Sequence, residues 1–180
     1  MRRFLVISNT VDTSKPLSLN SLTGFGRLDV ICRCINAAFF LSNEFRKDVI
    51  LCIYFWINSK IMEIWGDKVH GINPDERAIA GVLKRVFNGR SYPGIRFYTS
   101  NLEYFLQQQK FIVIDKRGDQ SLHLLNEYDS YLLGDQVGLP NQIYTYFSNQ
   151  PKLSLGTSTY LSSQVITILN YLIDSIGPDE

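Results

Sequence analysis

The segment Leu153-Ser154-Leu155-Gly156-Thr157-Ser158, followed by the apolar run Leu161–Ile176, decides the fold of this chain. It reads as the end of a short strand, a glycine loop and then a helix, and a glycine in that loop lets bare backbone approach a ligand. A second glycine turn, Leu132-Leu133-Gly134-Asp135-Gln136-Val137-Gly138-Leu139-Pro140, follows another apolar strand upstream. We therefore expect the two strand ends to close on one small molecule.

The rest of the chain alternates short apolar runs with helical patterns, which predicts an α/β fold with a largely parallel sheet. Tight spacing at Asn58-Ser59-Lys60 predicts one hairpin. The predicted strands are Arg3–Ser8, Val49–Ile57, Ile61–Trp65, Ile95–Thr99, Phe111–Ile114, Tyr131–Leu133 and Lys152–Leu155.

Four helices are predicted between these strands. The first runs from Leu28 to about Leu41, and the second from a cap at Asn73, with Pro74 in its first position, to about Phe87. A short third helix spans about Asn101 to Gln109, and the last is Leu161–Ile176. The charged segment Asp115-Lys116-Arg117-Gly118-Asp119 reads as a turn, and Gly177-Pro178-Asp179-Glu180 as a loose tail.

Length and composition narrow the class of protein. A chain of 180 residues suits a single domain, residues 1–180, and 45% hydrophobic with 19% charged residues describes a soluble globular protein. No apolar run approaches the ~20 residues of a membrane span, and the amino terminus lacks the apolar region of a signal peptide, so we expect no membrane association and a cytoplasmic protein. A net charge of +1 leaves RNA binding to local arginine and lysine clusters.

Metal chemistry is not expected. Cys32, Cys34 and Cys52 form no Cys-x-x-Cys pair and lie in apolar segments, which predicts buried free thiols. His70 and His123 are far apart in the sequence, so their spacing indicates neither a metal site nor a Ser-His-Asp triad. The dinucleotide and phosphate-loop glycine motifs are also absent.

The amino-terminal third carries a more specific pattern, Gly26-Arg27-Leu28-Asp29-Val30-Ile31-Cys32-Arg33-Cys34, continued by Ala37–Ser42 and Arg46–Val49. With Pro74-Asp75-Glu76-Arg77 and the two glycine turns, in this order, the chain resembles the archaeal tRNA pseudouridine N1-methyltransferases of the SPOUT, or α/β-knot, superfamily. The likeness spans nearly the whole chain. More distantly, the chain is similar to the Nep1-type ribosomal-RNA pseudouridine N1-methyltransferases, which carry an Arg-x-Asp where this chain has Arg27 and Asp29.

This resemblance implies S-adenosylmethionine (SAM) as cofactor, tRNA as partner, a homodimer and a trefoil knot in the carboxy-terminal part. The residues that it places around SAM are Ile114, Gly134, Leu153, Ser154, Leu155, Gly156 and Val165. One departure is visible, because family members often have a histidine and a cysteine where this chain has Leu161 and Val165. Since the SAM contacts there are expected to be mostly backbone or apolar, the departure bears more on side-chain roles than on the cofactor.

Methylation of N1 of pseudouridine requires loss of the N1 proton while the nitrogen faces the sulfonium methyl group. Asp29 and Arg27 are the candidate catalytic residues, because a carboxylate can accept the proton and a guanidinium can hold a base carbonyl or a phosphate. General base and substrate-orienting hydrogen bond are equally open for Asp29. A strong alternative is a purely local role, in which Asp29 stabilises the helix start in a pair with Arg27 or Arg33.

Three functions remain open from the sequence. The preferred one is methylation of a T-loop pseudouridine of tRNA at position 54, and the near alternative is the ribosomal-RNA version of the same reaction. A non-catalytic RNA-binding domain that keeps the fold is the third, motivated by Leu161 and Val165.

Overall fold

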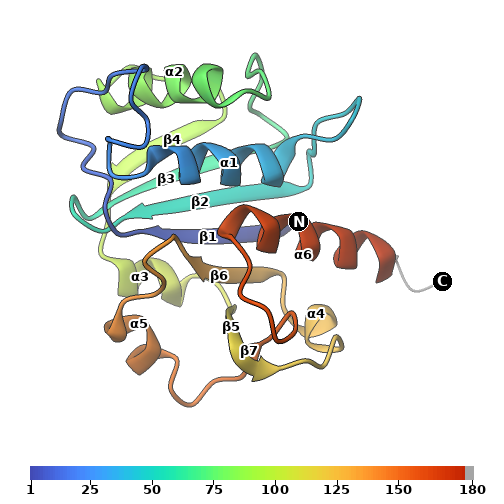
Figure 1. The fold of residues 1–180 in the computed structure, drawn as a ribbon. Coiled ribbons are helices and arrows are strands. Elements are labelled where there is room, and N and C mark those ends of the chain that lie inside the picture. Colours follow the sequence, from blue (N-terminus) through green and yellow to red (C-terminus); the bar gives the residue numbers. More distant parts are fainter. Residues whose placement is uncertain (177–180) are drawn as a thin grey trace.

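Seven strands form a single sheet in the order β4-β3-β2-β1-β6-β5-β7 in the computed structural model, which describes residues 1–176 (Figure 1). The strands β2, β1, β6, β5 and β7 are parallel to one another, whereas β3 runs antiparallel to both β2 and β4. The predicted α/β architecture with a largely parallel sheet is therefore confirmed. The strands are β1 (Arg2–Ser8), β2 (Val49–Phe55), β3 (Lys60–Trp65), β4 (Ile95–Thr99), β5 (Phe111–Asp119), β6 (Ser130–Gly134) and β7 (Lys152–Leu153).

Helices cover the sheet on two faces, and alternate residues of the central strand β1 point to each. Phe4 and Val6 belong to one hydrophobic cluster, which is completed by α1 (Leu28–Phe39), α2 (Glu76–Phe87), α4 (Leu124–Glu127) and α6 (Ser162–Ile176). Leu5 and Ile7 belong to the other, with α3 (Leu102–Gln107) and α5 (Asn141–Tyr146). Because β1 is apolar on both faces, it reads as a continuous apolar run, as buried parallel strands do.

The carboxyl ends of the parallel strands meet at one edge of the sheet. The predicted hairpin lies at this edge, where residues 56–59 join β2 to β3. In Figure 1 the arrowheads of β1 and β2 point to the same side as the amino-terminal end of α6. The loops that follow β6 and β7 therefore emerge side by side at the place where the sequence analysis expects the ligand.

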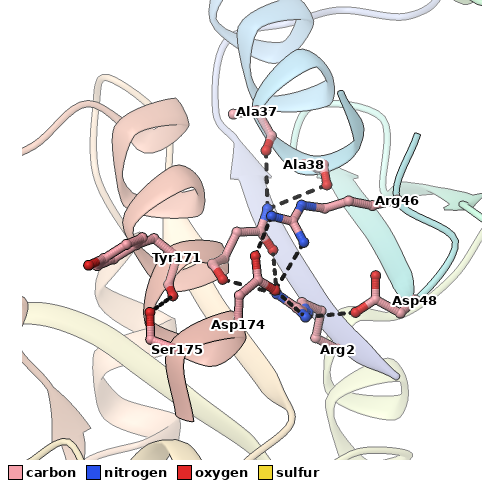
Figure 2. A network of polar contacts seen from close by, with 9 residues as sticks. Arg2, Ala37, Ala38, Arg46, Asp48, Tyr171, Asp174 and Ser175 are labelled. Atoms are coloured by element: carbon pink, nitrogen blue, oxygen red, sulfur yellow. Dashed lines mark hydrogen bonds and ion pairs between the residues drawn. The ribbon is translucent and has the colours of Figure 1, made fainter. Parts of the chain in front are cut away.

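A network of polar contacts holds the last turns of α6 against β1 and α1 (Figure 2). The Arg2 guanidinium donates to the backbone oxygen of Asn170 at 3.2 Å and to its side-chain oxygen at 3.1 Å, and the Asn170 amide donates to the Ala37 carbonyl at 3.1 Å. The Asp174 carboxylate accepts from Arg2 at 2.8 Å and from Arg46 at 2.5 Å. This network fixes the direction of α6 and so places its first turn at the ligand edge.

Several boundaries differ from the sequence expectation. The cap of α2 is Asp75, whose carboxylate accepts from the Ala78 N–H at 2.8 Å, and Asn73 is not the cap. Pro74 therefore precedes the helix instead of opening it. The first helix ends at Phe39, β2 ends at Phe55 and β7 ends at Leu153, each two residues earlier than expected.

The largest difference concerns the charged segment 115–119. The sequence predicts a turn there, but the segment continues β5, with an irregular register in which Ile114 and Asp119 both pair with Leu153. The short helices α4 and α5 are absent from the sequence prediction, because neither is long enough to show a 3.6-residue repeat. The expected tail at residues 177–180 lies outside the described residues. Within residues 1–176, no helix has the length and apolar character needed to cross a membrane.

Candidate active site

A cavity of about 560 Å³ lies at the carboxyl edge of the parallel strands. Its walls come from four parts of the chain, which are the start of α1, the middle of β5, the turn after β6 with α5, and the loop after β7 with the first turn of α6. Cavities of this size are typical of small-ligand sites. The structure thus brings together loops that are more than 100 residues apart in the sequence.

The loop after β7 is held by its serine. Ser154 is buried, its N–H donates to the Asp119 carbonyl at 2.7 Å, and its hydroxyl lies within hydrogen-bond distance of the carbonyl oxygens of Lys116 and Gly156, at 3.2 and 3.0 Å. Gly156 has a φ of 120°, a conformation that glycine adopts without strain, and a side chain there would meet no atom within 4 Å. This arrangement leaves the backbone of Leu155 and Gly156 on the cavity wall.

The turn after β6 is closed by backbone packed on backbone. A Cβ atom on Gly134 would lie 2.3 Å from the carbonyl carbon of Gly138, so only glycine fits there. Asp135 ties the turn to the end of β1, because its carboxylate accepts from the Asn9 N–H at 2.7 Å and from the Asn9 amide at 2.8 Å. The Gly134 carbonyl in turn accepts from the Ser162 hydroxyl at 2.7 Å, which joins this turn to the start of α6.

Arg27 and Asp29 form a two-pronged ion pair at the start of α1. The Arg27 Nε lies 2.9 Å from Oδ1 of Asp29 and its Nη2 lies 3.0 Å from Oδ2, while Arg33 donates to Oδ2 as well. The Asp29 side chain is only 8% exposed, whereas that of Arg27 is 45% exposed and lies on the cavity wall. Hydrogen bonds from Arg27 lower the pKa of Asp29 despite its burial.

The backbone around this pair is unusual. Arg27 has φ 62° and ψ 43°, the left-handed conformation that costs an L-residue about 1–2 kcal/mol. It follows Gly26, which is also left-handed and whose Cβ would lie 2.0 Å from the Thr10 carbonyl oxygen. The entry to α1 is thus forced into a tight bend that turns the Arg27 side chain toward Asp29.

A similar pair stands in the irregular part of β5. Arg117 Nε lies 3.0 Å from Oδ1 of Asp115, and its Nη2 lies 2.8 Å from Oδ2. The guanidinium carbon of Arg117 also lies 5.3 Å from the centre of the Tyr144 ring, and all three residues line the cavity. Sequence reasoning missed this cluster, although the Asp-x-Arg spacing was available as a signal.

Six of the nine residues predicted for the site line the cavity. They are Arg27, Ile114, Gly134, Leu155, Gly156 and Val165. The other three do not reach its wall, because Leu153 and Ser154 are buried behind the loop and Asp29 is buried behind Arg27 and Arg33. Asp135, Tyr144 and Ser162 belong to the cavity but were not predicted.

The described residues also show what the cysteines do. Cys32, Cys34 and Cys52 are buried and unpaired, and burial raises the pKa of each thiol to about 12. The prediction of buried free thiols is confirmed. Among residues 1–176, no group of three or more His, Cys, Asp or Glu side chains is placed to hold a metal ion.

Comparison with known proteins agrees with this geometry. Residues 1–177 match the model of a family described as "Putative SAM-dependent RNA methyltransferase". The chain is 30% identical to the tRNA (pseudouridine(54)-N(1))-methyltransferase of Methanocorpusculum labreanum, over 94% of this chain and 95% of the relative. It is 31% identical to the protein of the same name from Methanococcus vannielii, over 98% of this chain and 100% of that one.

Among solved structures, the fold is similar to that of Archaeoglobus fulgidus Nep1 bound to S-adenosylhomocysteine, with a TM-score of 0.75 and 12% sequence identity over 97% of this chain and 98% of that one. This likeness supports the fold, and the sequence matches extend along the whole described chain. The chain therefore belongs to this family of SAM-dependent RNA methyltransferases, together with the tRNA (pseudouridine(54)-N(1))-methyltransferases that it matches.

Proposed function

We propose that this protein methylates N1 of pseudouridine 54 in the T-loop of tRNA, as a single domain acting in the cytoplasm. The full-length similarity to relatives named for this reaction supports the substrate. The observation that carries the proposal for this chain is one cavity in which two glycine turns meet the exposed guanidinium of Arg27. Such a cavity offers a place for a small cofactor beside a group that binds RNA oxygens.

The cavity suits SAM by its chemistry. SAM carries no phosphate, so its adenine and its amino-acid part need backbone hydrogen-bonding groups and apolar walls. Ile114, Leu155 and Val165 supply apolar wall, while Gly134 and Gly156 supply bare backbone. Leu153 and Ser154 hold the loop in place from behind. We propose that these seven residues form the SAM site and that the loops which carry them form the trefoil knot.

When bound, SAM supplies the electrophilic methyl group, and the residues of this chain orient the base. The Arg27 guanidinium donates to a carbonyl oxygen of the pseudouridine, which favours the negative charge that develops as N1 loses its proton. Asp29 holds that guanidinium in place. With its pKa lowered and its oxygens engaged by Arg27 and Arg33, Asp29 is a weak proton acceptor, so the N1 proton passes to water.

A homodimer is part of this proposal. A second hollow, of about 590 Å³, lies between α1, the segment before α2 and the outer face of α6, and the half-exposed Ile168 and the exposed Tyr160 line it. It shares Arg33, Tyr160 and Ser163 with the candidate SAM cavity. A second copy packed on this hollow would bury exposed apolar surface and enclose the cavity, as interfaces between subunits often do.

The test is methylation of defined RNA. Purified protein, SAM and a tRNA that contains pseudouridine 54 should give N1-methylpseudouridine at that position by mass spectrometry. The matched control is the same tRNA with uridine at position 54, which should gain no methyl group. Product found only in ribosomal RNA would overturn the tRNA assignment. Absence of any binding heat with SAM in calorimetry would instead indicate the non-catalytic RNA-binding alternative.

A further inference from the structure

The segment 115–118 of β5 is built as a bulge. Ile114 and Asp119 pair with the same residue, Leu153, so the four residues between them leave the regular ladder. Bulges of this kind redirect side chains and are common beside active sites. Here the bulge is anchored to the candidate SAM loop, because the Ser154 hydroxyl donates to the Lys116 carbonyl at 3.2 Å.

Close packing locks the bulge against β7. A Cβ atom on Gly118 would lie 2.5 Å from the Lys152 carbonyl oxygen and 2.9 Å from the Leu153 carbonyl carbon. The Asp115 carboxylate also accepts from the Arg117 backbone N–H at 2.9 Å, which closes a local turn within the bulge. The bulge is thus a rigid support whose side chains 115–117 line the cavity.

The cluster on this support repeats the arrangement of Arg27 and Asp29. In both pairs one residue separates the arginine from the aspartate, and Nε and Nη2 meet Oδ1 and Oδ2. In both the aspartate side chain is buried, with 5% exposure for Asp115, while the arginine is open, with 69% exposure for Arg117. Two guanidinium groups are therefore held at one cavity.

The two pairs come from different sides of the cavity. Arg27 begins α1, which packs against β2, whereas Arg117 belongs to β5, and β1 and β6 lie between these strands in the sheet. The guanidinium carbon of Arg117 also lies over the Tyr144 ring, 5.3 Å from its centre, which is within cation–π range. The two guanidinium groups on the cavity wall are thus carried by separate elements of the fold.

We propose that Arg117 is a second RNA-contacting residue, which binds a backbone phosphate next to the target nucleotide, and that Asp115 and Tyr144 position it. This inference rests on the proposed function. A phosphate is the occupant that fits, because Asp115 occupies only the Nε edge of this exposed guanidinium and the remaining N–H groups can donate to phosphate oxygens. The flipped-out or unstacked base would then be oriented by Arg27, and its flanking phosphate by Arg117.

The experiment measures tRNA binding over a range of salt concentrations, without SAM. We expect Arg117→Gln to raise the Kd for tRNA about tenfold and to reduce the slope of log K against log salt by about 0.7–0.9, the value for one lost phosphate contact. Arg117→Lys should lose less affinity and keep the slope, because the charge remains. Arg90→Gln, an exposed arginine outside the cavity lining, is the matched control and should change neither quantity.

Asp115→Asn separates positioning from charge. It should raise the Kd for tRNA several-fold but leave the salt slope unchanged, since the guanidinium is still charged but no longer held. None of the variants should change the Kd for S-adenosylhomocysteine. Arg117→Gln with the same tRNA affinity and slope as Arg90→Gln would overturn the proposal. A loss confined to S-adenosylhomocysteine binding would do so too and would assign Arg117 to the cofactor.

Methylation is assayed separately, so that the two proposals fail in different ways. Wild-type protein that binds tRNA but transfers no methyl group contradicts the proposed reaction, while the comparison of Arg117→Gln with Arg90→Gln still decides the phosphate contact. Thermal melts of each variant show that it is folded. If Arg117→Gln does not fold, Asp115→Asn supplies the test, and a wild-type Kd for tRNA in that variant would overturn the proposal.

Discussion

The Arg27 guanidinium and the Asp29 carboxylate meet through two hydrogen bonds of 2.9 and 3.0 Å, although a single residue separates them and Arg27 must take a left-handed backbone to allow it. Strained backbone at a cavity points to a functional demand on that residue. The demand here is the direction of the guanidinium. The same ion pair with Arg27 therefore stabilises the helix start and holds the Arg27 guanidinium in its functional direction.

Asp29→Asn should reduce kcat for methyl transfer by about 10²-fold, because loss of the pair frees Arg27 and misplaced groups cost about that much. Binding of S-adenosylhomocysteine should change little, since Asp29 is not on the cavity wall. Single-turnover methylation and calorimetry on the same samples check both. A near-normal single-turnover rate would show that Asp29 only stabilises the helix.

The pH profile distinguishes an orienting role for Asp29 from that of a base. Hydrogen bonds from Arg27 lower the pKa of Asp29 in the folded protein, so its carboxylate stays ionised throughout the neutral range. If Asp29 positions Arg27, log kcat of the wild type and of Asp29→Asn should rise with pH in parallel, because the N1 proton leaves to solvent in both. A flat wild-type profile beside a rising Asp29→Asn profile would identify Asp29 as the base.

Gly134→Val tests the turn after β6. The sequence alone suggests that a side chain here would occupy cofactor space, but the structure adds a nearer obstacle, because a Cβ atom on this residue would lie 2.3 Å from the backbone of Gly138. We therefore expect both a lower Tm and loss of S-adenosylhomocysteine binding. Gly81→Ala is the matched control, because its Cβ meets nothing within 4 Å in the middle of α2 and helix propensity should stabilise the protein by about 0.5–1 kcal/mol. Gly134→Val that melts and binds like the wild type would contradict the packing argument.

Asp174→Asn tests the network that fixes α6. Burial raises the pKa of Asp174, but hydrogen bonds from Arg46 and Arg2 outweigh it and the pKa is lowered overall. The carboxylate therefore stabilises the fold above its unfolded pKa, and this contribution is lost as pH falls through the lower folded value. We expect Asp174→Asn to cost about 1–2 kcal/mol of unfolding free energy at pH 7, since it leaves two largely buried arginines with fewer partners.

The control for this network is Asp48→Asn, which removes a more exposed partner of Arg2 and should cost less. Urea titrations at pH 7 and pH 3 measure the effect. The difference between Asp174→Asn and the wild type should shrink at the lower pH. An equal difference in unfolding free energy at pH 7 and pH 3 would mean that Asp174→Asn loses packing contacts and not a charge interaction.

Features of the fold could be predicted from the sequence where the residues that determine them are close together in the chain, and not where those residues are far apart. Strands such as β1 and β2 are recognisable as apolar runs, and the glycine turns at Gly134 and Gly156 are visible as breaks after strands. The cap of α2 was misassigned because Asn73 and Asp75 are both capping residues around Pro74, and only the backbone decides between them. The charged residues after Ile114 read as a turn because their pairing partner, β7, lies more than 30 residues away.

The same distinction holds for the site. Arg27 and Asp29 can be predicted as a pair because they are neighbours in sequence. The contact of Tyr144 with Arg117 cannot be predicted from the sequence. The two residues are far apart in the chain, and only the folded structure brings α5 and β5 to the same cavity. Nor does the sequence show that the Ser154 side chain turns inward to bind its own loop and the Lys116 carbonyl.

Ile168→Glu tests the proposed homodimer. Ile168 lies in the hollow between α1 and α6, where a carboxylate would be desolvated by a second copy but remains in water on a single chain. Light scattering should therefore give a dimer for the wild type and a 20.7 kDa monomer for Ile168→Glu, with little change in Tm beyond that of dissociation. Tyr104→Glu, an equally drastic change at an exposed position on α3, should stay dimeric. A wild type that remains a 20.7 kDa species at all micromolar concentrations would refute the dimer, and methylation by Ile168→Glu at the wild-type rate would show that the cavity is complete within one subunit.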